Sequence, residues 1–302
     1  DLDGGIGFRL GGVAAHDNSG QSVSSTGDVN GDGFDDLIIG AYGADPNGTF
    51  SGTSHVVFGK ASGFSSAINL SSLNGCTGFR LDGVSADDNS GFSVSSAGDV
   101  NGDGFDDLIV GAWLANKNGT NDGTGASYVV FGKSSGFSSA INLSSLNGST
   151  GFRLNGVVVY DRSGYSVSSA GDVNGDGFAD LIVGAGQADP NGTDSGTSYV
   201  VFGKASGFSS AINLSSLDGS TGFRLDGVSA HDNSGQSVSS AGDVNGDGFD
   251  DLIVGARLAD PNGSASGASY VVFGKSSGFS STINLSSLDG STGFRLNGVA
   301  AY

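Results

Sequence analysis

The chain has 302 residues, of which 56 are glycine, and it carries a formal net charge of -19. All 31 acidic residues are aspartate, and there is no methionine. Glutamate and methionine favour helices whereas aspartate and glycine favour turns, so the composition predicts short strands joined by tight turns. The negative charge excludes nucleic acid and anionic membrane surfaces as partners, because both bind basic patches.

The sequence shows no apolar run of membrane-spanning length and no signal peptide. Its first residue is not methionine, which predicts a mature or excised piece of a longer precursor. Cys76 stands where the other repeats carry serine, so we expect no disulfide framework.

A nine-residue string, DVNGDGFDD, occupies residues 28–36 and returns at 99–107, 172–180 and 243–251, once with a single change. The first Asp of each copy stands at 28, 99, 172 and 243, so the repeat spacings are 71, 73 and 71 residues. Repetition of this length predicts a repeat architecture before any local assignment is made.

Each repeat contains four strand-like segments. In the first repeat they are the following, in chain order. Residues 19–27 (SGQSVSSTG) are small and polar, and residues 35–41 (DDLIIGA) form a continuous apolar run typical of a buried strand. Residues 54–60 (SHVVFGK) and 78–84 (GFRLDGV) complete the set. DPNG at 45–48 is a strong turn signal, and a longer Ser-rich stretch separates the last two strands.

Four antiparallel strands repeated radially predict an all-β fold, a β-propeller of four-stranded antiparallel blades with the small first strand innermost. A parallel β-helix fits less well, because its repeats are much shorter. The predicted divisions are a surplus outer strand at 1–16 and blades at 17–88, 89–161, 162–232 and 233–302.

The string itself places hard oxygen donors at positions 1, 3, 5 and 9, with the main-chain carbonyl of position 7 available. Five such oxygens, three of them anionic, suit Ca²⁺ better than Mg²⁺. An EF-hand needs glutamate at position 12, where this chain has Ile39 or a valine, so the loop is not an EF-hand. We predict about four calcium ions, one per repeat. The predicted ligands are Asp28, Asn30, Asp32, Phe34, Asp36, Asp99, Asn101, Asp103, Phe105, Asp107, Asp172, Asn174, Asp176, Phe178, Asp180, Asp243, Asn245, Asp247, Phe249 and Asp251.

The alternative is that Asn-Gly-Asp-Gly forms plain hairpin turns without a metal. That explains a single loop, but not why three mutually repelling carboxylates are packed together four times. Ala179 replaces the position-8 aspartate found at 35, 106 and 250, which indicates that this carboxylate is not a ligand.

The stretch SGQSVSSTGDVNGDGFDDLIIGA and its copies resemble FG-GAP repeats, the units of the integrin α-subunit β-propeller. In that family a Gly-x-Ser-Val strand leads into a D-x-N-x-D-G-x-x-D calcium loop and then into an apolar strand ending in Gly-Ala. The resemblance implies an extracellular or cell-surface, calcium-stabilised propeller used for adhesion, ligand binding or scaffolding. Two features depart from the family: it usually has seven blades, and the proline after Gly-Ala is missing here.

A ligand face is predicted opposite the calcium loops, where equivalent loop positions differ between repeats. Variation at these positions is typical of a recognition surface, although drift at unconstrained positions predicts the same pattern. In the resembling family this face carries the ligand. The candidates are His16, Tyr42, Asp87, Phe92, Trp113, Tyr160, Tyr165, His231 and Arg257.

The residues do not favour an enzyme, because no nucleophile pattern accompanies the three histidines. The arginine that recurs in each fourth strand is interpreted as part of an ion pair between blades. Two functions remain: a structural or adhesive extracellular module, and a lectin-like or protein-binding module that uses the ligand face. The expected partners are a second copy of the chain and a glycan or protein ligand, without insertion into a membrane.

GFRL occurs five times, beginning at 7, 78, 151, 222 and 293, whereas the calcium string occurs four times. One copy is therefore surplus, and we expect it to stay unpaired or to add to a sheet of another molecule. Head-to-tail strand addition would build a filament or surface array. The alternative is that the chain is a segment cut from a longer tandem array, and both can hold at once. On this hypothesis, deleting residues 1–12 or residues 291–302 abolishes assembly.

Overall fold

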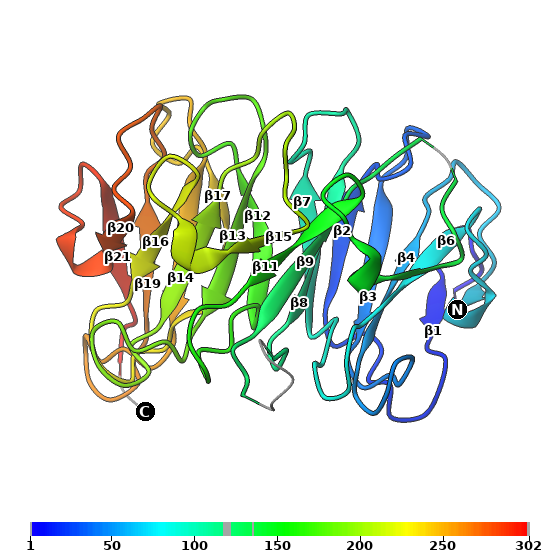
Figure 1. The fold of residues 1–302 in the computed structure, drawn as a ribbon, viewed down its shortest axis with the longest axis horizontal. Coiled ribbons are helices and arrows are strands. Elements are labelled where there is room, and N and C mark those ends of the chain that lie inside the picture. Colours follow the sequence, from blue (N-terminus) through cyan, green and yellow to red (C-terminus); the bar gives the residue numbers. More distant parts are fainter. Residues whose placement is uncertain (1, 117–121, 135, 301–302) are drawn as a thin grey trace.

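The computed structural model describes residues 2–116, 122–134 and 136–300. The repeats form four large sheets, which Figure 1 shows side by side in chain order along the longest axis of the molecule. The sheet of the first repeat lies at one end of this row and the sheet of the last repeat at the other. The all-β fold class of propeller-type blades is confirmed, and across the described residues the row of blades is open.

Within each repeat, four strands pair antiparallel in the order in which they occur in the chain. In the first repeat they are β2 (Val23–Gly27), β3 (Asp36–Ala41), β4 (Thr53–Val57) and β6 (Gly78–Asp82). The later repeats contain β7 (Ser93–Gly98), β8 (Asp107–Ala112), β9 (Ala126–Val130) and β11 (Gly151–Asn155); β12 (Ser166–Gly171), β13 (Asp180–Ala185), β14 (Thr197–Val201) and β16 (Gly222–Asp226); and β17 (Ser234–Gly242), β18 (Asp251–Ala256), β19 (Ala268–Val272) and β21 (Gly293–Asn297).

The cores lie between the sheets. One cluster joins Ile38 and Phe79 of the first repeat to Leu108 and Tyr128 of the second, and all four side chains are at most 1% exposed. The first strands β2, β7, β12 and β17 are neighbours in successive sheets, where their small Ser, Ala and Gly residues permit close approach. Both faces of an interior sheet are covered, which explains why its second strand is a continuous apolar run rather than an alternating one.

A short strand, not expected from the sequence, lies in each Ser-rich connection. These strands are β5 (Ala67–Asn69), β10 (Ala140–Asn142), β15 (Ala211–Asn213) and β20 (Thr282–Asn284). Each is followed by a 3₁₀ turn: η1 (Leu70–Ser72), η2 (Leu143–Ser145), η3 (Leu214–Ser216) or η4 (Leu285–Ser287). Strands β10, β15 and β20 add in parallel to the outer strand of the preceding blade, so three sheets have five strands rather than four.

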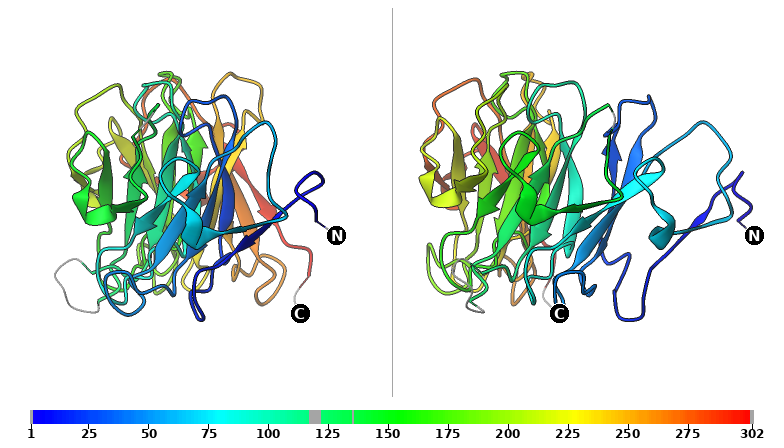
Figure 2. Two further views of the ribbon diagram at one scale, coloured as in Figure 1. Left: turned by 90° about the vertical axis from the view of Figure 1, so that its right-hand side faces the viewer. Right: turned by 45° about the vertical axis from the view of Figure 1, so that its right-hand side comes forward.

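The surplus N-terminal strand is neither unpaired nor free, which corrects the expectation from strand counting. It forms β1 (Arg9–Gly11), which pairs in parallel with β5 of its own molecule, Leu10 opposite Ile68. Phe8 stacks on Phe64 at a centroid distance of 4.5 Å. Figure 2 shows β1, in dark blue, at the outer margin of the molecule. β1 therefore holds the place that the outer strand of a preceding blade would occupy.

The predicted ion pairs between blades are wrong for two of the five recurring arginines, Arg80 and Arg224, because each pairs with an aspartate of its own strand. Arg224 lies 2.7 Å from Asp226, and Arg80 pairs with Asp82 in the same way. Side chains two residues apart point to the same side of a strand, which brings these charges together. Arg153 has no aspartate two residues later and instead lies over the ring of Tyr128.

Among the described residues, none of the helices has both the length and the apolar character that a membrane-spanning helix needs.

Candidate metal centre and ligand face

The candidate calcium loops connect the first and second strands of each blade, so the loop that starts at Asp28 joins β2 to β3. Gly31 and Gly33 have φ angles of 73° and 88°, in the left-handed region that glycine adopts without strain. The loop can therefore curl tightly over a few residues. The second, third and fourth repeats have left-handed glycines at the same two positions.

The carboxylate at position 1 of each loop accepts the hydrogen bonds that hold the tight turn. Asp28 Oδ1 accepts hydrogen bonds from the amides of Gly31 at 2.7 Å and Asp32 at 3.0 Å, and Oδ2 accepts one from Gly33 at 2.8 Å. The same three bonds form around Asp99, Asp172 and Asp243. A carboxylate that accepts several amides is held in a fixed orientation.

The carboxylate at position 9 is buried at the start of the apolar strand. Asp36 is 0% exposed, and its oxygens accept hydrogen bonds from Gly59 at 2.8 Å and Val29 at 3.1 Å. Burial raises its pKa to about 7, and the nearby charges of Asp32 and Asp28 also act to raise it. Burial likewise raises the pKa of Asp107 and Asp180 to about 8 and raises that of Asp251.

The donor chemistry of each loop fits a hard divalent cation. The aspartates at positions 1, 5 and 9 are close enough to repel one another, and no Lys or Arg pairs with them among the described residues. Their oxygens mostly face backbone amides, as when Asp32 accepts from Phe34 at 3.0 Å. The described residues contain no group of three or more His, Cys, Asp or Glu side chains already placed to hold a metal. Convergence of the ligand oxygens on one ion stays a prediction.

The aspartate at position 8 has a different partner, which the sequence did not reveal. Asp106 Oδ2 accepts a hydrogen bond from the Asp28 amide at 2.9 Å, across the junction between the first two blades. Asp250 accepts from the Asp172 amide at 2.8 Å in the same way. Ala179 cannot make this bond at the junction between the second and third blades. Position 8 thus links a calcium loop to the next blade.

The predicted ligand face lies at the other end of the second strand from the candidate calcium loop. β3 begins at Asp36 in the loop, whereas Tyr42 follows its last residue. Six residues of strand span about 20 Å, so the two regions lie at opposite ends of the blade. Antiparallel connectivity therefore separates them as the sequence predicts.

Four of the nine ligand-face candidates form one aromatic cluster: Tyr42, Phe92, Trp113 and Tyr165. Phe92 is central, with ring centroids 5.5, 5.4 and 4.9 Å from those of the other three. Arg162 lies over the indole of Trp113 at 4.8 Å. The four rings come from the first three blades and are half-buried.

The other five candidates do not join this cluster. His16, Asp87, Tyr160 and His231 occupy equivalent loop positions, all with left-handed φ angles between 65° and 70°. Arg257 lines a separate cavity in the last blade. The structure therefore brings four of the nine candidates together, and a ligand at this cluster stays a prediction.

The surroundings of the three histidines bear on whether they could act as catalytic bases. Among the described residues, no hydrogen bond joins a histidine to a serine or cysteine side chain. His55 is buried in β4, where burial lowers its pKa to about 4 and neither ring nitrogen has a hydrogen-bond partner. His16 and His231 lie exposed in loops.

Comparison with known proteins agrees with this architecture. The family model described as FG-GAP repeat matches residues 19–57, 90–130, 163–201 and 234–272, more than half of the chain. The chain belongs to the FG-GAP repeat family. Each match begins at or just before the first strand of a blade and ends at the last residue of its third strand. The resemblance to integrin-type repeats noted in the sequence is thereby confirmed.

The FG-GAP chain is similar to several curated proteins. Integrin alpha-V from Gallus gallus is 32% identical over 252 residues, which are 80% of this chain and 20% of that protein. Integrin alpha-4 from Xenopus laevis is 30% identical over 165 residues, 54% of this chain and 14% of that protein. Phosphatidylinositol-glycan-specific phospholipase D from Dictyostelium discoideum is 29% identical over 286 residues, 90% of this chain and 28% of that protein. The FG-GAP chain thus spans less than a third of each.

Proposed function

We propose that this chain is a calcium-stabilised, non-enzymatic adhesion module that works outside the cell or on its surface. The main observation in support is that three carboxylates lie close together at the start of each second strand. Burial and like charge raise the pKa of the position-9 aspartate there. The integrin relatives support the adhesive role. One relative is named as a phospholipase D, but the chain covers only 28% of it.

The proposed ligands in the first loop are Asp28, Asn30, Asp32, the Phe34 carbonyl and Asp36, with the equivalent five residues in the other loops. A bound divalent cation would supply the positive charge that the carboxylates lack. Calcium modules of extracellular proteins have dissociation constants of about 10⁻⁴ to 10⁻³ M and are occupied only where calcium is plentiful. This supports a location outside the cell.

Counting bound ions tests the calcium proposal. We expect the wild-type chain to bind about four Ca²⁺ after dialysis against millimolar calcium, since it has one loop per repeat. Asp32→Ala should lower the count by one, because position 5 contributes a ligand. Asp35→Ala is the matched control and should leave the count unchanged, because the third repeat already carries alanine at this position. Equal ion counts for wild type and Asp32→Ala would refute this ligand assignment.

The aromatic cluster supports a second function, a lectin-like or protein-binding module. Half-buried aromatic side chains offer large apolar area at low entropic cost, as binding surfaces of proteins do. We expect the wild-type chain to retain one class of glycan on a glycan array. Trp113→Ala should abolish that signal, whereas Tyr160→Ala, an exposed ring outside the cluster, should preserve it. An array without signal would leave protein ligands as the only targets of this face.

The structural role includes self-association, which the sequence predicts as head-to-tail strand addition into a filament or surface array. The strand addition that this role requires already occurs inside the molecule, where β10, β15 and β20 each add in parallel to the outer strand of the neighbouring blade.

A further inference from the structure

At the end of the strands away from the calcium loops, the three junctions between neighbouring blades are alike. In the first junction Ser90–Gly91 inserts between two glycines of the preceding blade. A Cβ atom on Gly40 would lie 2.0 Å from the Gly91 carbonyl oxygen, and one on Gly52 would lie 2.0 Å from that of Ser90. Only glycine permits so close an approach of two backbones. The Ser-Gly pairs at 163–164 and 234–235 insert in the same way, so this end does not distinguish one junction from another.

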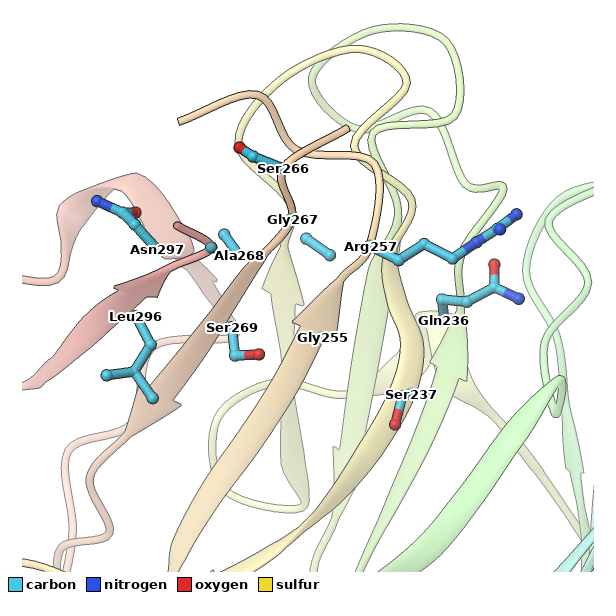
Figure 3. Close-up of a pocket in the computed structure, with 12 residues that line it drawn as sticks. Gln236, Ser237, Gly255, Arg257, Ser266, Gly267, Ala268, Ser269, Leu296 and Asn297 are labelled. Carbon is cyan, nitrogen blue, oxygen red and sulfur yellow. The ribbon is translucent and has the colours of Figure 1, made fainter. Parts of the chain in front are cut away.

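In the fourth blade the equivalent space holds no inserted backbone among the described residues. It is a cavity of about 500 Å³. Figure 3 shows Arg257 and Gln236 on one side of this cavity and Leu296 on the other. Because a neighbouring backbone fills the same space in the first three blades, the cavity by itself is no evidence of a ligand site.

At the other end of the strands, the loop of the second repeat holds the calcium loop of the first. Two hydrogen bonds join Asp106, at position 8 of the second loop, to Asp28, at position 1 of the first. The Asp106 amide donates to the Asp28 carbonyl at 3.2 Å, and the Asp28 amide donates to Asp106 Oδ2 at 2.9 Å. The Lys133 amide donates to the Val29 carbonyl at 3.0 Å. The start of the first loop is thus fixed by the second repeat.

The third junction repeats both bonds between position 8 and position 1, whereas the second junction keeps one of them. The Asp250 amide donates to the Asp172 carbonyl at 3.1 Å, and Asp250 Oδ2 accepts from the Asp172 amide at 2.8 Å. At the second junction the Ala179 amide donates to the Asp99 carbonyl at 3.0 Å, but alanine has no acceptor for the Asp99 amide. The backbone is therefore placed alike at all three junctions, and only the carboxylate is missing from one.

A left-handed glycine before each loop makes room for the position-8 side chain. Gly27 has a φ angle of 67°, and a Cβ there would lie 2.1 Å from Asp106 Oδ2. Gly171 does the same at the third junction. Gly98 has a φ angle of 69°, and a Cβ there would lie 2.6 Å from the Cβ of Ala179. The second junction is therefore shaped for an aspartate, although the sequence supplies alanine.

We infer that the position-8 aspartate of one repeat positions the calcium loop of the preceding repeat, so that the first and third loops bind calcium more tightly than the second. The inference rests on the calcium-binding function proposed above. It makes Asp106 and Asp250 positioning residues for a loop to which they do not belong.

Two physical effects of the position-8 carboxylate favour binding. Its hydrogen bond fixes the main chain of Asp28, whose side chain is the first proposed ligand. A loop that is already held in its folded shape loses less conformational entropy when it binds. The carboxylate also adds negative charge beside the loop, and both rigidity and charge raise the affinity of calcium sites.

The same contact links the loops of neighbouring repeats. Asp106 stands between Phe105 and Asp107, which are two proposed ligands of the second loop. When the second loop holds its ion, both neighbours of Asp106 are fixed, and so is the contact with Asp28. Filling the second loop should therefore strengthen the first, and the effect is reciprocal. At the second junction alanine stands in this place, so the link between the second and third loops is weaker.

Nitrogen-15 NMR during a calcium titration tests the inference, because each loop has its own reporter. The amide of the position-6 glycine donates to the position-1 carboxylate in every loop. Four resonances therefore give four dissociation constants in one sample, from Gly33, Gly104, Gly177 and Gly248. Those of the first and third loops should be about tenfold below that of the second, as expected for one charge-assisted hydrogen bond.

Asp106→Ala should raise the dissociation constant of the first loop about tenfold, because the Asp28 amide loses its acceptor. The constants of the third and fourth loops should not change, which shows that the fold is intact. Asp106→Asn keeps an oxygen acceptor without the charge and should raise the constant less. Asp250→Ala should have the corresponding effect on the third loop.

Ala179→Asp supplies the missing carboxylate, and it adds a contact where the other variants remove one. It should lower the dissociation constant of the second loop about tenfold, to that of the first and third. A variant that misfolds cannot give this result. Ala179→Leu is the matched control, since its side chain adds volume without an acceptor, and it should not lower the constant.

The link between loops is tested by disabling one loop and measuring its neighbour. Asp103→Ala, which removes a ligand of the second loop, should raise the dissociation constant of the first. Asp176→Ala, which removes a ligand of the third loop, should raise that of the second by a smaller factor. In the Asp106→Ala background, Asp103→Ala should lose most of its effect on the first loop.

Equal dissociation constants for the first and second loops of the wild type would overturn the inference. So would an Ala179→Asp variant whose second loop binds calcium no more tightly than before. Glycine amides that do not respond to calcium at all would overturn the calcium proposal and this inference together. Four responding loops with the same constants in every variant would overturn this inference alone.

Discussion

Melting the protein in calcium and in a chelator should give clearly different midpoints, with the chelated protein unfolding at the lower temperature. An ion that binds only the folded state stabilises it by about 1.4 kcal/mol at ten times the dissociation constant and by about 2.7 kcal/mol at one hundred times. Four loops that unfold together would contribute about 6 to 11 kcal/mol. For a chain of this size we expect the midpoint to move by more than about 10 °C.

Magnesium is the matched control for this experiment. It carries the same charge, but it is smaller and demands near-ideal octahedral geometry, so it should restore only a small part of the lost stability. Equal midpoints in calcium and chelator would contradict the proposed role of the loops. They would favour the plain hairpin turns, held by bonds such as those from the Gly31 and Gly33 amides to Asp28.

The four antiparallel strands of each blade were predictable because each is marked locally, by an apolar run, a turn signal or the repeated GFRL. The parallel strands β5, β10, β15 and β20 were not, because three residues within a Ser-rich connection carry no periodicity. Their partners lie in another blade, as Ile141 pairs with Leu81 some sixty residues earlier. The place of β1 was missed for the same reason, since its partner β5 was unknown.

The same distinction between locally marked features and contacts between blades applies to the candidate site. The curl of each loop involves residues within nine positions, so the sequence predicted which side chains it brings together. The role of Asp106 depends on Asp28, 78 residues away, and only the packing of neighbouring blades reveals it. The repeated Ser-Gly before each first strand was a visible signal, but its insertion between two glycines requires knowledge of both blades.

Phe152→Ala should destabilise the protein far more than Phe294→Ala, although both residues stand in the same local sequence, STGFRLNGV. Phe152 is 0% exposed and stacks on Phe208 of the next repeat at 4.6 Å. Removing a buried phenylalanine leaves a cavity and costs about 3 to 5 kcal/mol. Phe294 is 36% exposed, so its loss should cost about 1 kcal/mol.

Urea unfolding at low protein concentration measures both costs, because the transition midpoint falls in proportion to the lost stability. Equal losses for the two variants would show that the local sequence, rather than the neighbouring blade, determines the contribution of this ring.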